Sequence, residues 1–238
     1  MKKDLHHFNY RGIHVSIHWT FILVLLWFAI ANLLTGFTST GWIWSLIMLF
    51  SLMVSILADD LAQAVVGTMY GMKIDSLIIM PTGGLPSIST KPKKKYHELL
   101  MLAAGPAANL SIAAFLAYFL HPYKAYWDEP ENIGSAYPGN FIFQFQFINL
   151  SLGLLNLLPS FPMDGGRALD TFLEKKYSTA KAKRIVNLIS ICLAGVFFAS
   201  GIIYMKYPLL LIGFFIIFTV GQGKYYHPFK SDVAYPAK

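Results

Sequence analysis

Apolar residues run through this 238-residue chain in long blocks, and the segments between the blocks carry most of the charges and prolines. A helix needs about 20 apolar residues to cross the hydrocarbon core of a bilayer. The candidate blocks are residues 15–34, 42–66, 99–120, 141 to the proline-rich stretch 158–162, 186–204 and 208–220. The pattern predicts an all-α polytopic membrane protein with about six transmembrane helices.

The composition agrees with this fold class and excludes two others. Hydrophobic residues make up 55% of the chain and charged residues 13%, with a mean hydropathy of +0.52. A soluble domain carries about 25% charged residues, so this chain has too few to cover a soluble surface. A disordered chain would lack these aromatic and branched residues. The single cysteine, Cys192, permits neither an intramolecular disulfide nor a cysteine-rich zinc site.

The formal net charge of +7 is distributed unevenly. Lysine and arginine gather before the first block, between the second and third, between the fourth and fifth, and after the sixth. Only Lys124 and Lys206 fall on the opposite side. By the positive-inside rule, this predicts an integral membrane protein with both termini in the cytoplasm. The basic residues then face the lipid bilayer, and no nucleic-acid recognition module is visible.

Residues 74–90 break the helical pattern. A β-branched, apolar run there is followed by Pro81, Gly83 and Gly84, which predicts a short strand or hairpin after the second helix. Non-helical backbone near a membrane must be shielded by protein or wetted by a cavity. We therefore expect this segment at the mouth of a cavity, within a single membrane-embedded domain covering residues 1–238.

Two carboxylates interrupt the second apolar block. Asp59 and Asp60 would cost about 2.5 kcal/mol or more each near the centre of a transmembrane helix. Gln63 lies four residues after Asp59, so both side chains share one helix face. Such groups either mark the interfacial end of a tilted helix or face a polar cavity, a metal ion or a proton path.

A second unusual segment closes the fourth block. Residues 156–167 hold an asparagine, two prolines and an Asp-Gly-Gly-Arg sequence that begins at Asp164. Prolines and glycines break a helix and can deliver backbone groups and a carboxylate to a central cavity.

With these residues the chain resembles the site-2 protease family of intramembrane zinc metalloproteases. The resemblance covers most of the chain, through residues 58–71, 81–84, 105–109 and 156–167. In the family, a His-Glu-x-x-His helix supplies two zinc ligands and a general base, and a distant aspartate supplies the third ligand. The resemblance implies Asp59, Gln63 and Asp164 at the ligand positions, Asp60 at the base and Asn156 at the substrate-steadying asparagine.

The chain departs from the family pattern at these positions. Both imidazoles are absent, and Asp60 is one methylene shorter than the family's glutamate. A carboxylate and amide set suits magnesium, calcium or manganese better than zinc. His14 and His18, four residues apart near the expected start of the first helix, are either substitute ligands or interfacial residues. Gly105, Pro106 and Asn109 are expected to serve mainly in helix packing.

Three functions remain open at this point. The first is a non-catalytic relative with a degraded zinc site, which binds a transmembrane helix or partner protein by strand addition to residues 74–90, with Pro81, Gly83 and Gly84 in the docking segment. The second is an active intramembrane metalloprotease with atypical ligands. The third is an ion-coupled transporter that uses Asp59, Asp60 and Asp164 as a polar pathway.

Overall fold

The computed structural model describes residues 4–10, 13–18, 22, 26, 29–30, 33, 39–79, 85–88, 90, 92, 94–120 and 138–222. The described helices are α2 (Ser39–Met69), α3 (Lys95–Leu120), α5 (Pro138–Asn156), α6 (Asp164–Leu173), α7 (Thr179–Ile203) and α8 (Tyr207–Gln222). The described strands are β1 (Asp4–Tyr10), β2 (Ile13–His18), β3 (Ile74–Ile79) and β4 (Leu85–Ile88).

The helical part follows the apolar blocks. Within the described residues, three helices are long and apolar enough to cross a membrane: Ile43–Met69, Lys95–Phe119 and Thr179–Ile203. They correspond to the second, third and fifth predicted crossings. Phe141–Asn156 and Tyr207–Gly221 are shorter apolar helices at the fourth and sixth positions. Most of the first predicted block, 15–34, lies outside the described residues.

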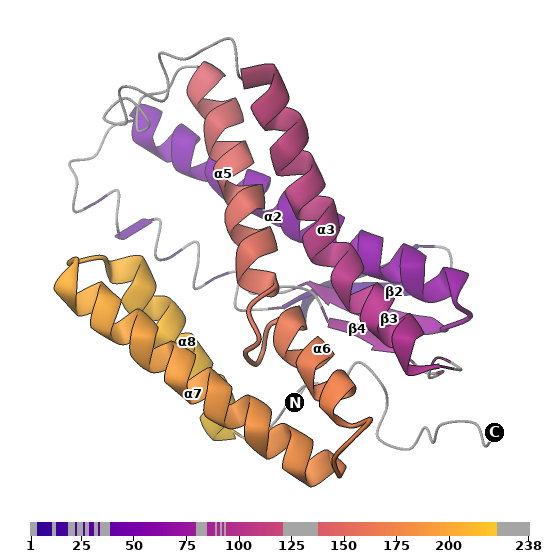
Figure 1. The fold of residues 1–238 in the computed structure, drawn as a ribbon. Coiled ribbons are helices and arrows are strands. Elements are labelled where there is room, and N and C mark those ends of the chain that lie inside the picture. The colour runs from indigo at the N-terminus through magenta and orange to yellow at the C-terminus, as the bar shows by residue number, and fades with distance from the viewer. Residues whose placement is uncertain are drawn as a thin grey trace.

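The strands form one four-stranded sheet in the order β1-β2-β3-β4. β2 pairs antiparallel with β1 and parallel with β3, and β3 pairs antiparallel with β4. β3 and β4 fall in the segment for which the sequence predicts a strand or hairpin, while Pro81, Gly83 and Gly84 lie outside the described residues. The sheet lies against the C-terminal part of α2 (Figure 1).

The N-terminal strands correct the sequence analysis in one respect. We expected a helix from residue 15, but β2 continues through His18. The alternation of Ile13, Val15 and Ile17 with polar residues has the two-residue period of a strand. Parallel pairing with β3 then satisfies backbone groups that a membrane-facing strand would leave unpaired.

The helices pack in two groups joined by α6. α2, α3 and α5 contact one another, α7 and α8 form a hairpin, and α6 contacts both α3 and α7 (Figure 1). α6 is only 10 residues long and carries Asp164, Arg167 and Asp170, so it is no candidate for a membrane crossing.

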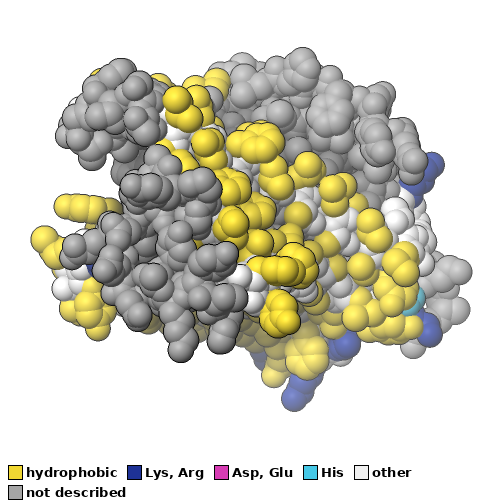
Figure 2. All heavy atoms as spheres, turned by 90° about the horizontal axis from the view of Figure 1, so that it is seen from above, with side chains coloured by type: hydrophobic (Ala, Val, Ile, Leu, Met, Phe, Trp, Pro, Cys, Tyr) yellow, Lys and Arg dark blue, Asp and Glu magenta, His cyan; other side chains and the backbone are white. Residues whose placement is uncertain are grey.

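Several polar residues are buried in these helices, and many large apolar residues are exposed. On α2, Ser55 and Gln63 are buried, whereas the side chains of Leu61 and Val65 are 50% and 57% exposed. Figure 2 shows hydrophobic side chains gathered over much of the described part of one face. A soluble protein has the reverse arrangement. Exposed apolar side chains are unfavourable in water, but they are not unfavourable in lipid. The chain is therefore an integral membrane protein.

Glycines set the closest approach between α3 and α5. A Cβ atom on Gly153 of α5 would lie 2.8 Å from Leu110 Cγ and 3.2 Å from the Pro106 carbonyl oxygen, both on α3. By contrast, a Cβ atom on Gly195 of α7 would meet nothing within 4 Å. The two positions differ in packing although both lie inside apolar helices.

This difference can be tested with one substitution at each position. We expect Gly153→Ala to lower the free energy of unfolding by about 1–3 kcal/mol, because α3 and α5 must separate to admit the methyl group. Gly195→Ala should cause no loss, since alanine fits the open space and favours a helix. Thermal unfolding in detergent, followed by circular dichroism, measures both variants. Equal effects would contradict the assigned α3–α5 contact.

The C-terminal half of α6 is held against α3 by polar contacts. The Thr171 hydroxyl donates a hydrogen bond to Glu98 (3.2 Å), and Lys95 pairs with Glu174 at 3.1 Å. Asp170, the residue before Thr171, is buried. Burial raises the pKa of Asp170 to about 6, and the carboxylates of Glu174 and Glu98 add to the rise, while Lys183 and Lys95 oppose it.

The raised pKa of Asp170 predicts a pH effect on stability. The folded protein binds the Asp170 proton more tightly than the unfolded chain does. The protonated carboxyl therefore stabilises the fold at low pH, and this part of the free energy of unfolding is lost as the pH rises from about 4 to about 6. Asp170→Asn should remove this loss, worth at most about 3 kcal/mol, and make the variant more stable than the parent at pH 7.5. Melting temperatures from pH 4.5 to 7.5 measure the difference. Parallel pH profiles for the two proteins would disprove it.

Candidate functional site

A buried polar stripe runs along one face of α2. Ser51, Ser55, Asp59 and Gln63 follow at intervals of four residues, and all four side chains are buried. Four-residue spacing places them one above another on the helix face that packs against α3 and α5. Asp59 and Gln63, the two residues nearest the C-terminal end of α2, were predicted as site residues from the sequence.

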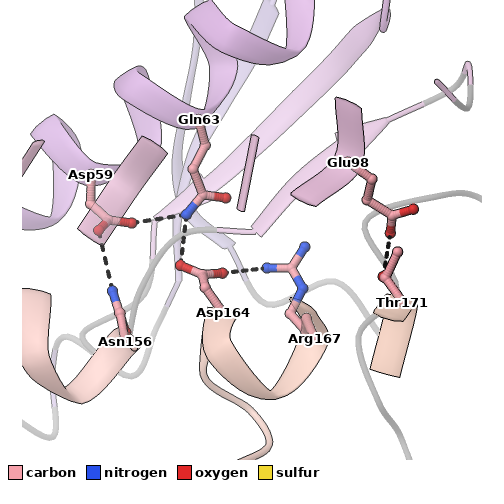
Figure 3. Close-up of polar contacts among 7 residues, drawn as sticks. All are labelled: Asp59, Gln63, Glu98, Asn156, Asp164, Arg167 and Thr171. Carbon is pink, nitrogen blue, oxygen red and sulfur yellow. Dashed lines mark hydrogen bonds and ion pairs between the residues drawn. The ribbon is translucent and has the colours of Figure 1, made fainter. Parts of the chain in front are cut away.

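The side-chain amide of Gln63 joins two carboxylates from different helices. Its Nε2 atom donates hydrogen bonds to Asp59 Oδ2 at 3.0 Å and to Asp164 Oδ2 at 2.8 Å (Figure 3). The amide nitrogen carries two hydrogens and so can serve both acceptors. We call Asp59, Gln63 and Asp164 the amide bridge. It connects α2 to the first residue of α6.

The break between α5 and α6 delivers Asp164 to this position. α5 ends at Asn156, and the turn that follows is anchored to α7 by a hydrogen bond from the Phe161 amide to Ser190 Oγ at 2.9 Å. A Cβ atom on Gly165 would collide with the Leu157 carbonyl group, and one on Gly166 would collide with the backbone of Ser160. The two glycines therefore let the first turn of α6 pack directly on the chain that leads into it.

Asp59 has two further amide partners. Asn109 of α3 and Asn156 of α5 donate from Nδ2 to Asp59 Oδ1, at 3.1 and 3.2 Å. Gly105 makes room for this carboxylate, because a Cβ atom there would lie 2.5 Å from Asp59 Oδ2. The structure thus brings Asn156 to Asp59 and adds Asn109, for which we expected mainly a packing role. The signal in the sequence was an asparagine one turn after a glycine in an apolar helix.

Arg167 is a second site residue that the sequence analysis did not single out. Its guanidinium donates to Asp164 Oδ1 at 2.9 Å, and both side chains are about nine-tenths buried. Burial raises the pKa of Asp164, whereas the charge of Arg167 and the hydrogen bonds from Gln63 and Arg167 act in the opposite direction. The three-residue spacing from Asp164 on a short helix was the available signal.

The other predicted site residues lie elsewhere or outside the described part. Asp60 is fully buried in α2, about 100° around the helix from Asp59. His14 and His18 lie in strand β2 rather than at a helix start. Four residues along a strand span about 13 Å, so the helical spacing expected for a shared metal ion does not hold. Pro81, Gly83 and Gly84 lie outside the described residues.

The residues of the site do not fit a zinc ion. All four carboxylate oxygens of Asp59 and Asp164 already accept hydrogen bonds, and the Arg167 cation lies beside Asp164. Within the part of the chain that the structure describes, no three His, Cys, Asp or Glu side chains are placed to hold a metal ion. Catalytic zinc sites use imidazole or thiolate donors in most sets of three protein ligands. The arrangement can instead fix a carboxylate and link helices.

Comparisons with known proteins agree with this fold. The model of peptidase family M50 matches residues 131–197. Zinc metalloprotease MJ0392 of Methanocaldococcus jannaschii is 32% identical over 222 residues, which cover 93% of this chain and 61% of that protein. The putative zinc metalloprotease Rip3 of Mycobacterium tuberculosis is 29% identical, over 86% of this chain and 54% of its own length. The chain thus spans little more than half the length of these relatives.

A solved structure covers the whole fold. The site-2 protease from Methanocaldococcus jannaschii superposes with a TM-score of 0.70 at 27% identity, over 98% of this chain and 99% of that one. Sequence and structure lead to the same group of proteins. In sequence and in fold the chain is similar to the site-2 protease family of membrane proteins, peptidase family M50.

Proposed function

We propose that this chain is a non-catalytic member of the site-2 protease family, which binds a transmembrane helix or partner protein without cutting it. The observation that carries the proposal is the amide bridge. The resemblance puts family zinc ligands at Asp59, Gln63 and Asp164, and here one amide group hydrogen-bonds both carboxylates. The side chain of Gln63 then does the structural work of a metal ion, which is to hold α2 to α6.

Electrostatics supports this assignment. Asp59 accepts hydrogen bonds from Gln63, Asn109 and Asn156. Asp164 accepts hydrogen bonds from Gln63 and from the positively charged Arg167. A divalent cation at this place would have to displace the amide hydrogens and lie close to the guanidinium. Repulsion between like charges is strong in a buried site, where the effective dielectric constant is low. The amide bridge therefore needs no metal ion to hold α2 to α6.

The residue at the family's general-base position is also poorly suited to catalysis. Asp60 stands where the family has a glutamate, and the shorter side chain reaches about 1 Å less far. A misplacement of that size can cost about 100-fold in rate. An active metalloprotease with atypical ligands would need both a hard divalent ion at the amide bridge and catalysis by this shorter carboxylate.

The sheet offers a docking mode for the partner. β4 stands at the end of the strand order and, among the described residues, pairs on one side with β3. An extended segment of a partner can add to such an edge through backbone hydrogen bonds. We propose this docking site at β4 and the preceding residues Pro81, Gly83 and Gly84, in a single domain with both termini in the cytoplasm. The position of the sheet against α2 brings the edge close to the helix that carries Asp59 and Gln63.

Metal analysis tests the assignment directly. We expect the purified protein to retain substoichiometric zinc, because the carboxylate oxygens are engaged and the imidazoles are absent. A triple variant, Asp59→His with Asp60→Glu and Gln63→His, restores the family pattern and should retain about one equivalent. Inductively coupled plasma mass spectrometry measures both. The same triple variant with Asp164→Ala is the control, and it should lose the gained zinc. One equivalent of zinc in the parent, lost in Asp59→Ala, would refute the proposal.

A binding assay tests the second part of the proposal, that the chain binds a transmembrane partner without cutting it. We expect a single-span peptide with a central Asn-Gly break to bind the parent protein in nanodiscs and to remain intact by mass spectrometry after long incubation. Ile88→Pro removes a backbone donor from β4 and should weaken binding several-fold, whereas Ile88→Val keeps the donor and should not. Cleavage of the peptide by the parent, abolished in Asp60→Ala, would show an active enzyme. Equal binding by the two Ile88 variants would exclude docking at β4.

A further inference from the structure

The junction between α6 and α7 carries an unusual surface. α6 is too short and too polar to cross the membrane, whereas α7 is a candidate span from its first residue, Thr179. The junction therefore lies where the chain passes from the membrane surface into the bilayer. Lys175, Lys176, Lys181 and Arg184 are all exposed there, and we call these four residues the basic junction.

Within its own stretch of the chain, the basic junction is accompanied by little negative charge. Between residues 172 and 190 the sequence holds one acidic residue, Glu174, and its carboxylate already pairs with Lys95 of α3. Asp170 is buried and faces Lys183, which is not part of the junction. Four exposed cations within ten residues therefore face outward and attract an anionic partner.

Aromatic rings lie beneath three of these cations. The Lys175 ammonium lies 5.6 Å from the ring centre of Phe172, and those of Lys176 and Lys181 lie 5.9 and 4.7 Å from the ring centre of Tyr177. Phe172 is 58% exposed near the C-terminal end of α6. An exposed phenylalanine is unfavourable in water but favourable at the acyl boundary of a bilayer, with the lysine ammonium groups at headgroup level.

We propose that the basic junction binds the phosphate groups of anionic phospholipids, with Phe172 inserted at the acyl boundary. The charge selects an anionic ligand. The exposed aromatic ring beside it favours a lipid over an acidic protein, because a lipid offers phosphate and hydrocarbon side by side at the membrane surface where the junction lies. Each basic residue near an anionic membrane surface strengthens binding by about fivefold. Four such residues therefore suffice for selective retention of anionic lipid.

Lipid bound here would act on the site through α6. The helix has the basic junction and Phe172 at its C-terminal end and Asp164 and Arg167 at its N-terminal end. Its 10 residues span about 15 Å, and Thr171 and Asp164 fasten it to α3 and α2. Anionic lipid would thus hold α6, which supplies Asp164 to the amide bridge, at a defined height in the membrane.

Native mass spectrometry of the full chain tests this proposal. The protein is released from mixed micelles of phosphatidylcholine and phosphatidylglycerol in equal amounts, and the retained lipids are counted. We expect selective retention of phosphatidylglycerol by the parent, reduced at least tenfold in the variant Lys175→Glu/Lys176→Glu/Lys181→Glu. The matched variant Lys175→Arg/Lys176→Arg/Lys181→Arg keeps the charge and should retain the lipid. Lys206→Glu, at the opposite end of α7, should have no effect.

Further measurements separate the possible outcomes. Phe172→Ser should reduce retention of phosphatidylglycerol while keeping every charge, which distinguishes a lipid from a free anion. Raising the salt concentration should weaken retention by the parent through screening.

Unchanged retention in the charge-reversed variant, or equal retention of the two lipids, would overturn the proposal. Binding of polyglutamate peptide that Phe172→Ser leaves unchanged, together with loss of lipid selectivity, would assign the junction to an acidic protein instead. If the charge-reversed variant fails to fold, the Phe172→Ser result and the salt dependence decide.

Discussion

The hydrogen bonds from one amide nitrogen to two buried carboxylates hold the centre of this structure together. Gln63 lies on α2, and Asp164 is the first residue of α6. Asp59 accepts hydrogen bonds from side-chain amides on α3 and α5. A buried carboxylate without donors is costly, so each helix that supplies a donor is held in register by the need to satisfy it. Four helices consequently meet at one polar point inside an otherwise apolar bundle.

The same constraint explains why the break after α5 has its particular residues. The chain must leave the bundle, turn and return a carboxylate to α2 within a few residues. Gly165 and Gly166 permit this because side chains there would collide with the backbone of the turn. Gly105 performs a similar role on α3, where it leaves space for the carboxylate of Asp59. Small residues and buried polar groups together replace the hydrophobic effect, which does not drive helices together in lipid.

In a metalloprotease of this family, a metal ion would link the same helices and also perform chemistry. A hydrogen-bonded amide links helices but offers no Lewis acid and activates no water. In the proposed function, Gln63 stands at a family imidazole position, where it keeps the link between helices and supplies no catalytic metal. A fold with a membrane-embedded site and a sheet beside it remains suited to binding, which is the function proposed for this chain.

The sequence by itself determined the class of the protein and the main members of its site. Long apolar blocks require helices in lipid, and Asp59, Gln63 and Asp164 stood out because charged or polar groups at membrane depth need a reason. Tertiary structure decided the rest. Strand β2 forms at residues predicted to begin a helix because its backbone pairs with β3, which lies more than 50 residues away in the sequence. Asn109 became a site residue only when α3 packed beside α2, since hydrogen bonds between distant segments depend on where helices meet and leave no periodic trace in the chain. Arg167 pairs with Asp164 within α6, and only the placement of α6 brings that local pair to the site.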